Sequence, residues 1–515
     1  MLAAEFIERG HMGEDDAQLT ALLKEAVALH QAGKLDAARA RYRQVLAHAP
    51  RQFDALHLLG VVTRQQGDAQ GAAALIAQAL AINPRQATAH CNLGAALQDL
   101  GRSEEALASY DAALDLNPGY ALAWSNRGNA LRKLGRLADA VASYERALAL
   151  RPDYPEAWCN RAMALLDLGE AGAALASSER ALAARSAYPQ AECVRANALF
   201  QLRQFETALR GYDDAIRLDA HLAEAHTGRG LSLQKLGRAQ EALASFERAL
   251  ALRPAHAQGH RQRADALLAL GRRDEAIAAY ERARALAREA GEDAGQLEFA
   301  LAALGVGAPP ERAPGAYVKA LFDQYAGHFD QHLTGVLGYR TPQLIAAAIE
   351  RHITGTMPAT VDLGCGTGLC APFLRPRSRR LLGVDLSENM LAQARATGLY
   401  DELVCADIGA CLGAQPASFD LAVAADVLVY FGDLDALFAQ VRAALRPGGW
   451  FCFSTEAGDG DGFTLLASQR YAHAAPYLER LAAAHGFIMI EAERAPVRSE
   501  NGVAIEGHLL ILRAA

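Results

Sequence analysis

The stretch GRSEEALASYDAALDLNPGYALAWSNRGNALRKL (101–134) is followed directly by a second version of itself, GRLADAVASYERALALRPDYPEAWCNRAMALLDL (135–168). The period is 34 residues. Each repeat contains two apolar patterns with the period of a helix, and a glycine that suits the end of a helix separates them. That glycine recurs on one ladder, which is broken only by Arg203: Gly33, Gly67, Gly101, Gly135, Gly169, Gly237 and Gly271. The sequence therefore predicts a series of helix pairs over roughly its first three hundred residues.

Small and aromatic residues on the second helix of each repeat support this pattern. Alanine holds one position throughout, at Ala38, Ala72, Ala106, Ala140, Ala174, Ala208, Ala242 and Ala276. An aromatic residue often follows four positions later, one turn along the same face, where it can fill the gap beside the partner helix: Tyr42, Tyr110, Tyr144, Tyr212, Phe246 and Tyr280. The pattern resembles the tetratricopeptide repeat family and predicts eight repeats over residues 19–290, after an N-terminal extension at 1–18.

Stacked helix pairs form a superhelix, and its concave groove usually holds peptides or other proteins. Asn92, Asn126 and Asn160 share one repeat position. They resemble the asparagine ladder of the O-linked N-acetylglucosamine transferase superhelix, which grips peptide backbone, and this implies a peptide or protein partner. The alternative is that asparagine only solvates the inner helix face. An arginine ladder lies one position further on, where the stems are expected to cover the neighbouring helix: Arg127, Arg161, Arg195, Arg229 and Arg263.

The pattern changes after residue 290. A closing helix is predicted over 291–303, and GVGAPPERAPG (305–315) is typical of a linker, so that 291–315 separates the repeats from a last region at 316–515. Strands are predicted at 359–363, 380–385, 402–406, 419–426 and 450–454, most of them followed by helices. Strands that alternate with helices indicate a parallel sheet. Two further strands, at 486–493 and 506–512, have no helix between them and predict a terminal antiparallel hairpin.

A glycine-rich loop follows the first predicted strand. Asp362-Leu363-Gly364-Cys365-Gly366-Thr367-Gly368 places three glycines where a strand turns into a helix, which permits a tight turn and lets a ligand lie against bare backbone. A dinucleotide fingerprint would need a further glycine where this chain has Leu369, so an NAD-dependent oxidoreductase is the weakest alternative.

Acidic residues end the next strands. Asp385 is placed to bind a ribose diol, which does not by itself separate NAD from other nucleoside cofactors. Asp407, beside Ile408, ends the third strand, and its carboxylate can accept a hydrogen bond from an adenine amine. Asp426 ends the fourth strand. Asp407 and Asp426 could instead be plain helix caps.

Residues 316–515 resemble the class I S-adenosylmethionine-dependent methyltransferases, through the acids, the three glycines and the hairpin just described. The resemblance implies a Rossmann-like domain with a mostly parallel sheet, S-adenosylmethionine as cofactor and S-adenosylhomocysteine as product. It implies that Gly364 and Gly366 hold the methionine end, that Asp385 holds the ribose and that Asp407 holds the adenine. The other residues of the implied cofactor site are Asp362, Cys365, Gly368, Leu386, Ile408 and Asp426, the last of which would face the reacting centre. The whole chain resembles a bacterial group of predicted methyltransferases with tetratricopeptide repeats, which implies no particular substrate.

The segment before the first strand offers candidate lid groups, namely Tyr325, His328, Phe329, Asp330, Tyr339 and Arg340. Arg340 could pair with the cofactor carboxylate or simply pack on the sheet. Candidate acceptor-side groups follow the fourth and fifth strands: Tyr430, Glu456, Tyr471 and His473. Tyr430 and His473 are the candidate catalytic residues. His473 has the natural pKa of a base, although a structural histidine is the alternative.

Composition limits the other possibilities. The 515 residues carry a formal net charge of −8, and the sequence after the fourth strand, Ala425-Asp426-Val427-Leu428, lacks the Asn/Asp-Pro-Pro-aromatic pattern of amino-methylating nucleic-acid enzymes. Nucleic acid is therefore not an expected substrate. The eight cysteines form no CxxC pair, so no zinc site is expected. Neither a signal peptide nor a long apolar segment is evident, which favours a cytoplasmic protein that does not bind membranes.

Three functional hypotheses follow. The first is an enzyme that methylates a protein, or a molecule carried by a protein, which the repeats recruit. The second is a small-molecule O-methyltransferase whose repeats serve only as a scaffold. The third is a non-catalytic adaptor, against which the intact glycine loop and the three strand-end acids argue.

Overall fold

The computed structural model describes residues 14–326, 329–330, 333, 335, 337–500 and 503–515. The chain divides into two compact units, Met1–Pro254 and Ala255–Ala515. His328, one of the candidate lid residues, lies outside the described residues.

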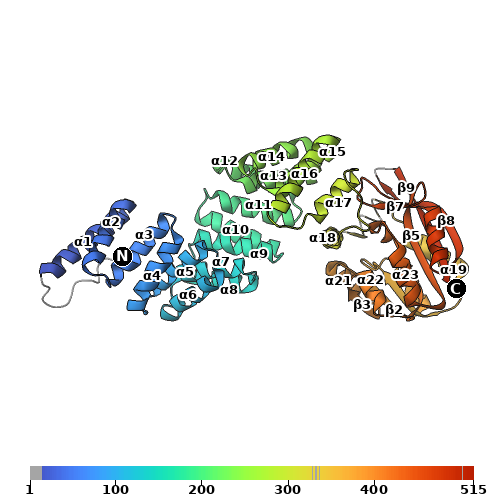
Figure 1. Ribbon diagram of the computed structural model, residues 1–515, viewed down its shortest axis with the longest axis horizontal. Helices are drawn as coiled ribbons and strands as arrows, with labels where there is room; N and C mark the ends of the chain where they lie inside the picture. The colour runs from blue at the N-terminus through green and yellow to red at the C-terminus, as the bar shows by residue number, and fades with distance from the viewer. Residues whose placement is uncertain (1–13, 327–328, 331–332, 334, 336, 501–502) are drawn as a thin grey trace. The chain divides into compact units, whose positions relative to one another are not determined.

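Helix pairs form the first unit and the start of the second, as the 34-residue period predicts (Figure 1). The helices are α1 (Glu14–Gln31), α2 (Leu35–His48), α3 (Phe53–Gln65), α4 (Ala69–Ile82), α5 (Ala87–Asp99), α6 (Ser103–Leu116), α7 (Ala121–Lys133), α8 (Leu137–Leu150), α9 (Pro155–Asp167), α10 (Ala171–Ala184), α11 (Pro189–Gln201), α12 (Phe205–Leu218), α13 (Ala223–Lys235), α14 (Ala239–Leu252), α15 (Ala257–Ala269) and α16 (Arg273–Glu289).

The turn inside each pair requires a left-handed residue. The seven ladder glycines have φ between 71° and 90°, and Arg203, at the position without glycine, adopts φ 61°. Behind the turn, the ladder aromatics are buried: Tyr110 packs against Gly94 and Tyr144 against Gly128, where a Cβ would lie only 2.6 and 2.5 Å from the rings. Close approach of the paired helices therefore depends on glycine facing tyrosine.

The second unit continues with helices and a nine-stranded sheet. The helices are α17 (Gly295–Ala303), α18 (Gly315–Tyr325), α19 (Thr341–His352), α20 (Ala371–Leu374), α21 (Glu388–Ala396), α22 (Ile408–Gly413), α23 (Asp435–Ala444) and α24 (Ala475–Ala484), with 3-10 turns η3 (Arg375–Arg377) and η4 (Leu428–Tyr430). The strands are β1 (Met357–Leu363), β2 (Ser378–Asp385), β3 (Glu402–Cys405), β4 (Phe419–Ala424), β5 (Leu445–Gly458), β6 (Phe463–Leu465), β7 (Tyr471–Ala474), β8 (Phe487–Glu500) and β9 (Val503–Ala514).

The sheet order is β3-β2-β1-β4-β5-β7-β6, with parallel pairing from β3 to β7. The hairpin β8–β9 is antiparallel, and β9 pairs antiparallel with β5, so the predicted closing hairpin is confirmed. The fold prediction is therefore confirmed, although the sequence pattern does not predict the short strands β6 and β7.

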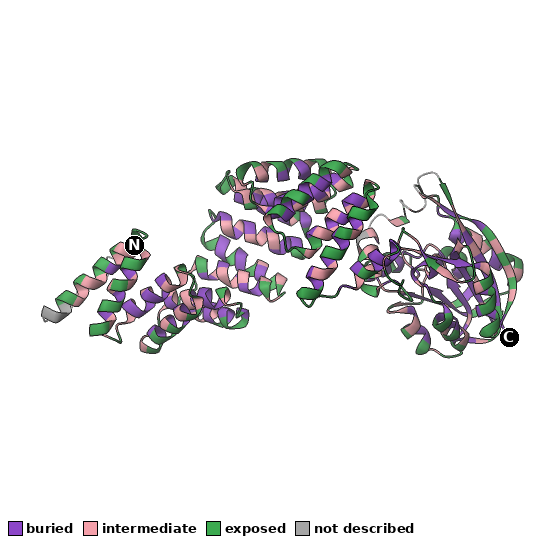
Figure 2. Ribbon diagram, turned by 45° about the horizontal axis from the view of Figure 1, so that its top comes forward, coloured by how far each residue is buried: buried purple, intermediate pink, exposed green. Residues whose placement is uncertain are grey.

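The strands of this sheet are largely buried (Figure 2), and alternate residues of a strand join two different cores. Phe451 and Phe453 of β5 join a core with α22, α23 and α24, whereas Cys452 between them joins a second core with α19 and α20. Helices thus cover both faces, and the carboxyl ends of the parallel strands are left to form a site.

The segment predicted as a linker is fixed to the sheet domain. Residues 310–313, which we call the strap, lie against η4 and β7: Ala313 N–H donates to the Tyr430 carbonyl at 2.8 Å, and the Tyr471 hydroxyl donates to the Pro310 carbonyl at 2.6 Å. Phe299 of α17 packs in the same apolar cluster as Val429 and Tyr471. The closing helix and the strap therefore form part of the structure around the site.

Candidate functional site

A cavity of about 680 Å³ opens at the carboxyl ends of β1, β2 and β4. Ten of the predicted site residues line it: Asp362, Gly364, Cys365, Gly366, Asp385, Leu386, Asp407, Ile408, Asp426 and Tyr430. These residues come from five separate stretches of the chain, and the ends of neighbouring strands bring them together.

The glycine loop can be built only with glycine. Gly364, Gly366 and Gly368 have φ values of 66°, 55° and 94°, which side chains rarely tolerate. A Cβ on Gly364 would lie 2.5 Å from Val427, whereas a Cβ on Gly366 would meet nothing closer than Phe329 at 3.9 Å and would project into the cavity. The loop thus presents bare backbone to a ligand. Gly368 forms the turn next to Tyr400 and does not line the cavity.

Asp385 holds the loop from β2. Its carboxylate accepts hydrogen bonds from the backbone N–H of Gly366 and of Ser387, each at 2.9 Å. Burial raises the pKa of Asp385, and these hydrogen bonds act in the opposite direction. A carboxylate has room for further acceptor contacts, so Asp385 can still bind hydroxyl groups in the cavity.

Asp362 lies at the end of β1 and is 1% exposed. Burial raises the pKa of its carboxyl group to about 7, the Tyr400 hydroxyl that donates to it at 2.6 Å lowers the pKa, and Asp385 raises it. Such a group is easily switched to the ionised form by a cation bound beside it.

Asp407 caps the helix that follows β3. Its Oδ1 accepts from Gly409 N–H at 2.9 Å and from Ala410 N–H at 3.3 Å, while its Oδ2 accepts from Arg312 at 3.0 Å. The alternative function of Asp407 as a helix cap is therefore realised, in a residue that also lines the cavity.

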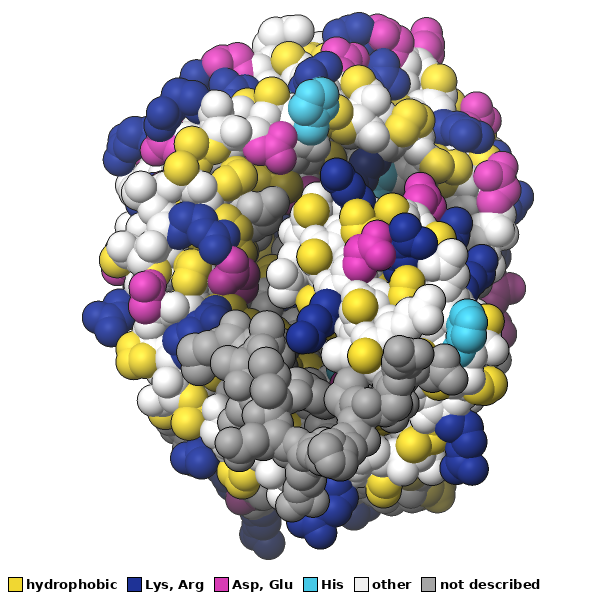
Figure 3. Space-filling model, turned by 90° about the vertical axis from the view of Figure 1, so that its left-hand side faces the viewer, with side chains coloured by type: hydrophobic (Ala, Val, Ile, Leu, Met, Phe, Trp, Pro, Cys, Tyr) yellow, Lys and Arg dark blue, Asp and Glu magenta, His cyan; other side chains and the backbone are white. Residues whose placement is uncertain are grey.

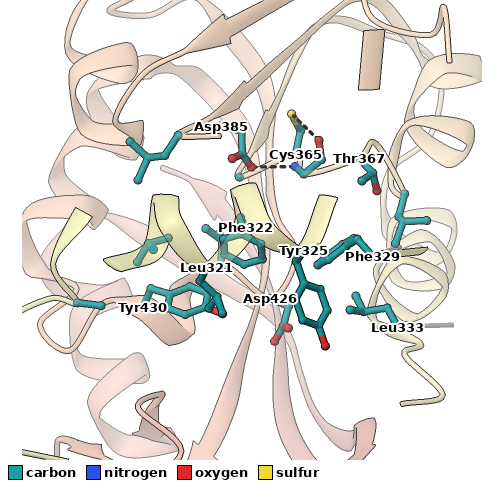
Figure 4. A pocket seen from close by; sticks show the side chains of 18 of the residues that line it. Leu321, Phe322, Tyr325, Phe329, Leu333, Cys365, Thr367, Asp385, Asp426 and Tyr430 are labelled. Atoms are coloured by element: carbon teal, nitrogen blue, oxygen red, sulfur yellow. Dashed lines mark hydrogen bonds between the residues drawn. The ribbon is translucent and has the colours of Figure 1, made fainter. Parts of the chain in front are cut away.

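Aromatic side chains cover the cavity on the side of α18. Figure 4 shows Phe322, Tyr325 and Phe329 pointing into the cavity, with Asp385 and Thr367 on one side of them and Asp426 and Tyr430 on the other. Phe322 makes edge contacts with Phe329 and with Tyr430. Tyr339 also lines the cavity, whereas Asp330 accepts a hydrogen bond from Thr367 at the rim. This segment can exclude water from a bound ligand.

Charged residues line the part of the cavity beyond β4. Asp426 has a left-handed φ of 57° and accepts a hydrogen bond from Arg470 at 2.5 Å. Glu456 accepts from Arg470 at 3.2 Å and from Arg498 at 2.7 Å. The sequence pattern points to both acids but to neither arginine. The stretch RYAHA, which begins at Arg470, offered one signal, because it places an arginine directly before a buried run.

Several predicted residues do not line the cavity: Gly368, Glu456, Tyr471, His473 and Arg340. His473 is fully buried on β7, its Nε2 lies 3.1 Å from the Gly432 carbonyl, and burial lowers its pKa to about 4. It therefore joins β7 to the backbone at Gly432, and this geometry gives no support to its predicted function as a base. Arg340 precedes α19, and its backbone N–H donates to the Val497 carbonyl. The residue is exposed and does not line the cavity. The geometry therefore does not support an ion pair between Arg340 and a cofactor carboxylate.

The asparagine ladder joins successive repeats. The side-chain amides of Asn92, Asn126 and Asn160 contact His57 at 2.9 Å, Cys91 at 3.8 Å and Asn129 at 3.0 Å, each in the preceding repeat. All three side chains are half-buried on first helices. Their amide groups therefore order the surface on which a peptide would have to lie.

The arginine ladder is structural. Arg127 bonds Asp111 and Ser143, at 2.7 and 2.8 Å, which lie 16 residues before and after it. Arg229 repeats the arrangement with Asp213 and Ser245. On the face that Figure 3 shows, Lys and Arg side chains lie among Asp and Glu side chains.

Comparison with known families adds a second line of observation. Residues 361–453 match the family described as a methyltransferase domain. Tetratricopeptide repeat families match residues 23–87, 87–120, 109–142, 128–169, 155–188, 193–257 and 227–294. The chain carries tetratricopeptide repeats and a methyltransferase domain.

Individual relatives cover parts of this methyltransferase domain. A ubiquinone biosynthesis O-methyltransferase from Idiomarina loihiensis is 36% identical over 112 residues, which are 21% of this chain and 46% of that protein. A malonyl-[acyl-carrier protein] O-methyltransferase from Enterobacter lignolyticus is 31% identical over 142 residues, or 28% and 54% of the two chains. The chain thus spans about half the length of these curated relatives. Among solved structures, a tetratricopeptide repeat protein from Thermus thermophilus is 31% identical and covers 36% of this chain and 98% of its own, with a TM-score of 0.32.

Two searches of the described residues gave negative results. No described helix is both long and apolar enough to cross a membrane. Within the same part of the chain, no group of three or more His, Cys, Asp or Glu side chains could hold a metal ion.

Proposed function

We propose that this protein is an S-adenosylmethionine-dependent methyltransferase whose repeats recruit the protein that is, or that carries, the methyl acceptor. The observation that carries the proposal is the junction between the glycine loop and β2, where Asp385 holds the backbone of Gly366 at the edge of the cavity. Bare backbone next to a carboxylate suits a nucleoside ligand at the end of parallel strands.

The residues present fit such a cofactor. Asp362 and the loop would hold its amino-acid end, Asp385 its ribose and Asp407 with Ile408 its adenine. The cofactor would bring an already activated methyl group, so the protein's contribution is alignment and exclusion of water. Phe322, Tyr325 and Phe329 would provide that exclusion from the side of α18.

Binding of S-adenosylhomocysteine to the full chain tests the cofactor assignment. Asp385→Asn should weaken binding by at least about tenfold. The new side-chain NH2 group would either face a backbone N–H of the loop or stand where the ligand needs an acceptor. Asp459→Asn, an exposed change after β5, is the matched control and should bind as the parent does. Equal affinity of the Asp385 variant and the parent in calorimetry would rule out the assignment.

Recruitment by the repeats rests on the tetratricopeptide array and its asparagine-bearing face. With methyl-tritiated S-adenosylmethionine and host extract, label on a discrete protein band should fall when Asn92, Asn126 and Asn160 are changed together to alanine. Three alanine changes at Glu104, Asp115 and Glu179, exposed on second helices, serve as the control. Undiminished label in the asparagine variant would limit the repeats to another function.

A second candidate is a small-molecule O-methyltransferase with the repeats as scaffold. The match to ubiquinone biosynthesis O-methyltransferases favours it. Label found only in the small-molecule fraction, and equal in both alanine variants, would support this function.

A further inference from the structure

Four charged side chains form one connected group in the cavity wall beyond β4. We call Asp426, Glu456, Arg470 and Arg498 the arginine cluster. Arg470 bonds both acids, Arg498 bonds Glu456, and Arg498 Nη1 lies 3.7 Å from Asp426. Asp426, Arg470 and Arg498 line the cavity. The cofactor end of the same cavity is instead lined by Asp362, Asp385 and Asp407.

The four side chains of the arginine cluster are largely buried. The side chains of Arg498 and Glu456 are 4% and 8% exposed, and those of Arg470 and Asp426 are 15% and 18% exposed. Burying charges of this kind is costly even when they are paired, so such a network is weak evidence for a function in stability and stronger evidence for a function in a site. Arg470 also lies over the Tyr430 ring, with 5.6 Å between the guanidinium carbon and the ring centroid.

The cavity offers cations beyond β4, where Arg470 and Arg498 line it. Among the described residues that line it there is no histidine and no lysine. Burial raises the pKa of Tyr430 to about 12 and also raises that of Tyr339, so both phenols stay protonated at neutral pH. Asp426 and Glu456 are occupied by the arginines. Among these described residues beyond β4, none is placed to take a proton from an alcohol or an ammonium group.

We propose that the methyl acceptor is a carboxylate, which Arg470 and Arg498 orient, and that the product is a methyl ester. This inference rests on the proposed function. A carboxylate is already ionised and needs no base. Arg470 uses two of the five N–H donors of a guanidinium on Asp426 and Glu456, and the group is suited to further carboxylate contacts.

The transfer balances without a proton. A lone pair of the carboxylate oxygen forms the new carbon–oxygen bond, the carbon–sulfur bond breaks, and its electron pair stays on sulfur. The arginine cluster has no net charge, so the negative acceptor and the positive sulfonium neutralise each other in the cavity, and the transfer leaves an uncharged ester and an uncharged thioether. Asp426 and Glu456 are positioning residues, because they act by holding the two guanidiniums.

The chemistry of the labelled product tests the proposal without knowledge of the acceptor. The full chain is incubated with methyl-tritiated S-adenosylmethionine and host extract, and the labelled material is then treated with mild alkali. Methyl esters release volatile tritiated methanol, whereas ethers and methylated amines keep their label. We expect most of the enzyme-dependent label to be released. Label that resists alkali would overturn the carboxylate assignment and leave the proposed function intact.

Two substitutions test whether Arg470 is the residue that orients the acceptor. Arg470→Lys keeps the charge but loses the planar fork, and should reduce the alkali-labile label by at least about tenfold while S-adenosylhomocysteine affinity stays within about twofold. Arg494→Lys, on the same strand as Arg498 but 59% exposed, should leave the label unchanged. Alkali-labile label at the parent level in Arg470→Lys would overturn the assignment of the acceptor to Arg470. Absence of enzyme-dependent label despite S-adenosylhomocysteine binding would overturn the proposed function and this inference with it.

Discussion

The carboxyl group of Asp362 couples ligand binding to pH. Its pKa is about 7 in the folded protein, and an ammonium group bound beside it would favour the ionised form. We therefore expect the affinity for S-adenosylhomocysteine to rise between pH 5.5 and 7.5, by up to about tenfold per pH unit below the pKa. Calorimetry across this range measures the effect. Asp362→Asn should flatten the profile, and an equally steep profile in this variant would place the titration elsewhere.

The Asp362 carboxyl group also affects the free energy of unfolding, which should change with pH in the opposite direction to the ligand affinity. Its pKa is raised from 3.8, so between pH 4 and 7 the folded protein holds a proton that the unfolded chain has released. The contribution of Asp362 to the free energy of unfolding therefore falls as pH rises through this window. Denaturant unfolding without ligand, compared between the parent and Asp362→Asn, should show a smaller loss of stability in the variant.

Alanine substitutions at Gly364 and Gly366 should differ in their effects on stability and on cofactor affinity. Gly364→Ala places a methyl group 2.5 Å from Val427, so it should lower the free energy of unfolding by about 2 kcal/mol. Gly366→Ala meets open space, so it should lower stability by only about 1 kcal/mol, through its left-handed φ, yet reduce cofactor affinity by at least about tenfold. Thermal unfolding and S-adenosylhomocysteine titration separate the two effects. Equal stability losses would contradict the geometry of the loop.

At the scale of elements, the strap changes where the methyltransferase domain can be cut. A chain that starts at residue 316 loses the hydrogen bonds to Tyr430 and Tyr471 and exposes the apolar cluster around Phe299. We expect its unfolding midpoint to lie at least about 5 °C below that of residues 255–515, with weaker S-adenosylhomocysteine binding. Equal midpoints would show that the strap adds nothing to the domain.

That the residues expected to hold a cofactor lie around one cavity could be predicted because their signals are local. The glycines at 364, 366 and 368 directly follow a strand, and Asp385 and Asp407 each end one, so spacing along the chain gives their position in space. The asparagine and arginine ladders were equally visible from the period. Their contacts were not, because hydrogen bonds between repeats depend on how the helices pack.

The arrangement of the arginine cluster depends on non-local geometry. The pairing of β8 with β9 shifts register between Pro496 and Arg498, and Val497 and Arg498 are both buried as a result. Strict alternation would place these neighbours on opposite faces, so no periodic pattern brings Arg498 to the cavity. The strap was missed for a related reason: glycine and proline predict irregular backbone, but they do not show what that backbone contacts.

At the scale of the molecule, the two compact units should respond differently to ligand. Because S-adenosylhomocysteine would bind within Ala255–Ala515, it should raise the unfolding temperature of that unit and leave that of Met1–Pro254 unchanged. Differential scanning calorimetry with and without the ligand measures both. A shift of the whole profile by the same amount would show that the chain unfolds as one cooperative body.

The arginine ladder also bears on how such a chain can change over generations. Arg127, Arg161 and Arg229 each join residues 16 positions to either side, so these bonds are defined by an offset and not by an absolute place in the sequence. Duplication or loss of a whole 34-residue segment preserves these offsets, whereas insertion of a single residue breaks them. The array can thus lengthen or shorten by recombination in whole repeats while the sheet domain stays the same.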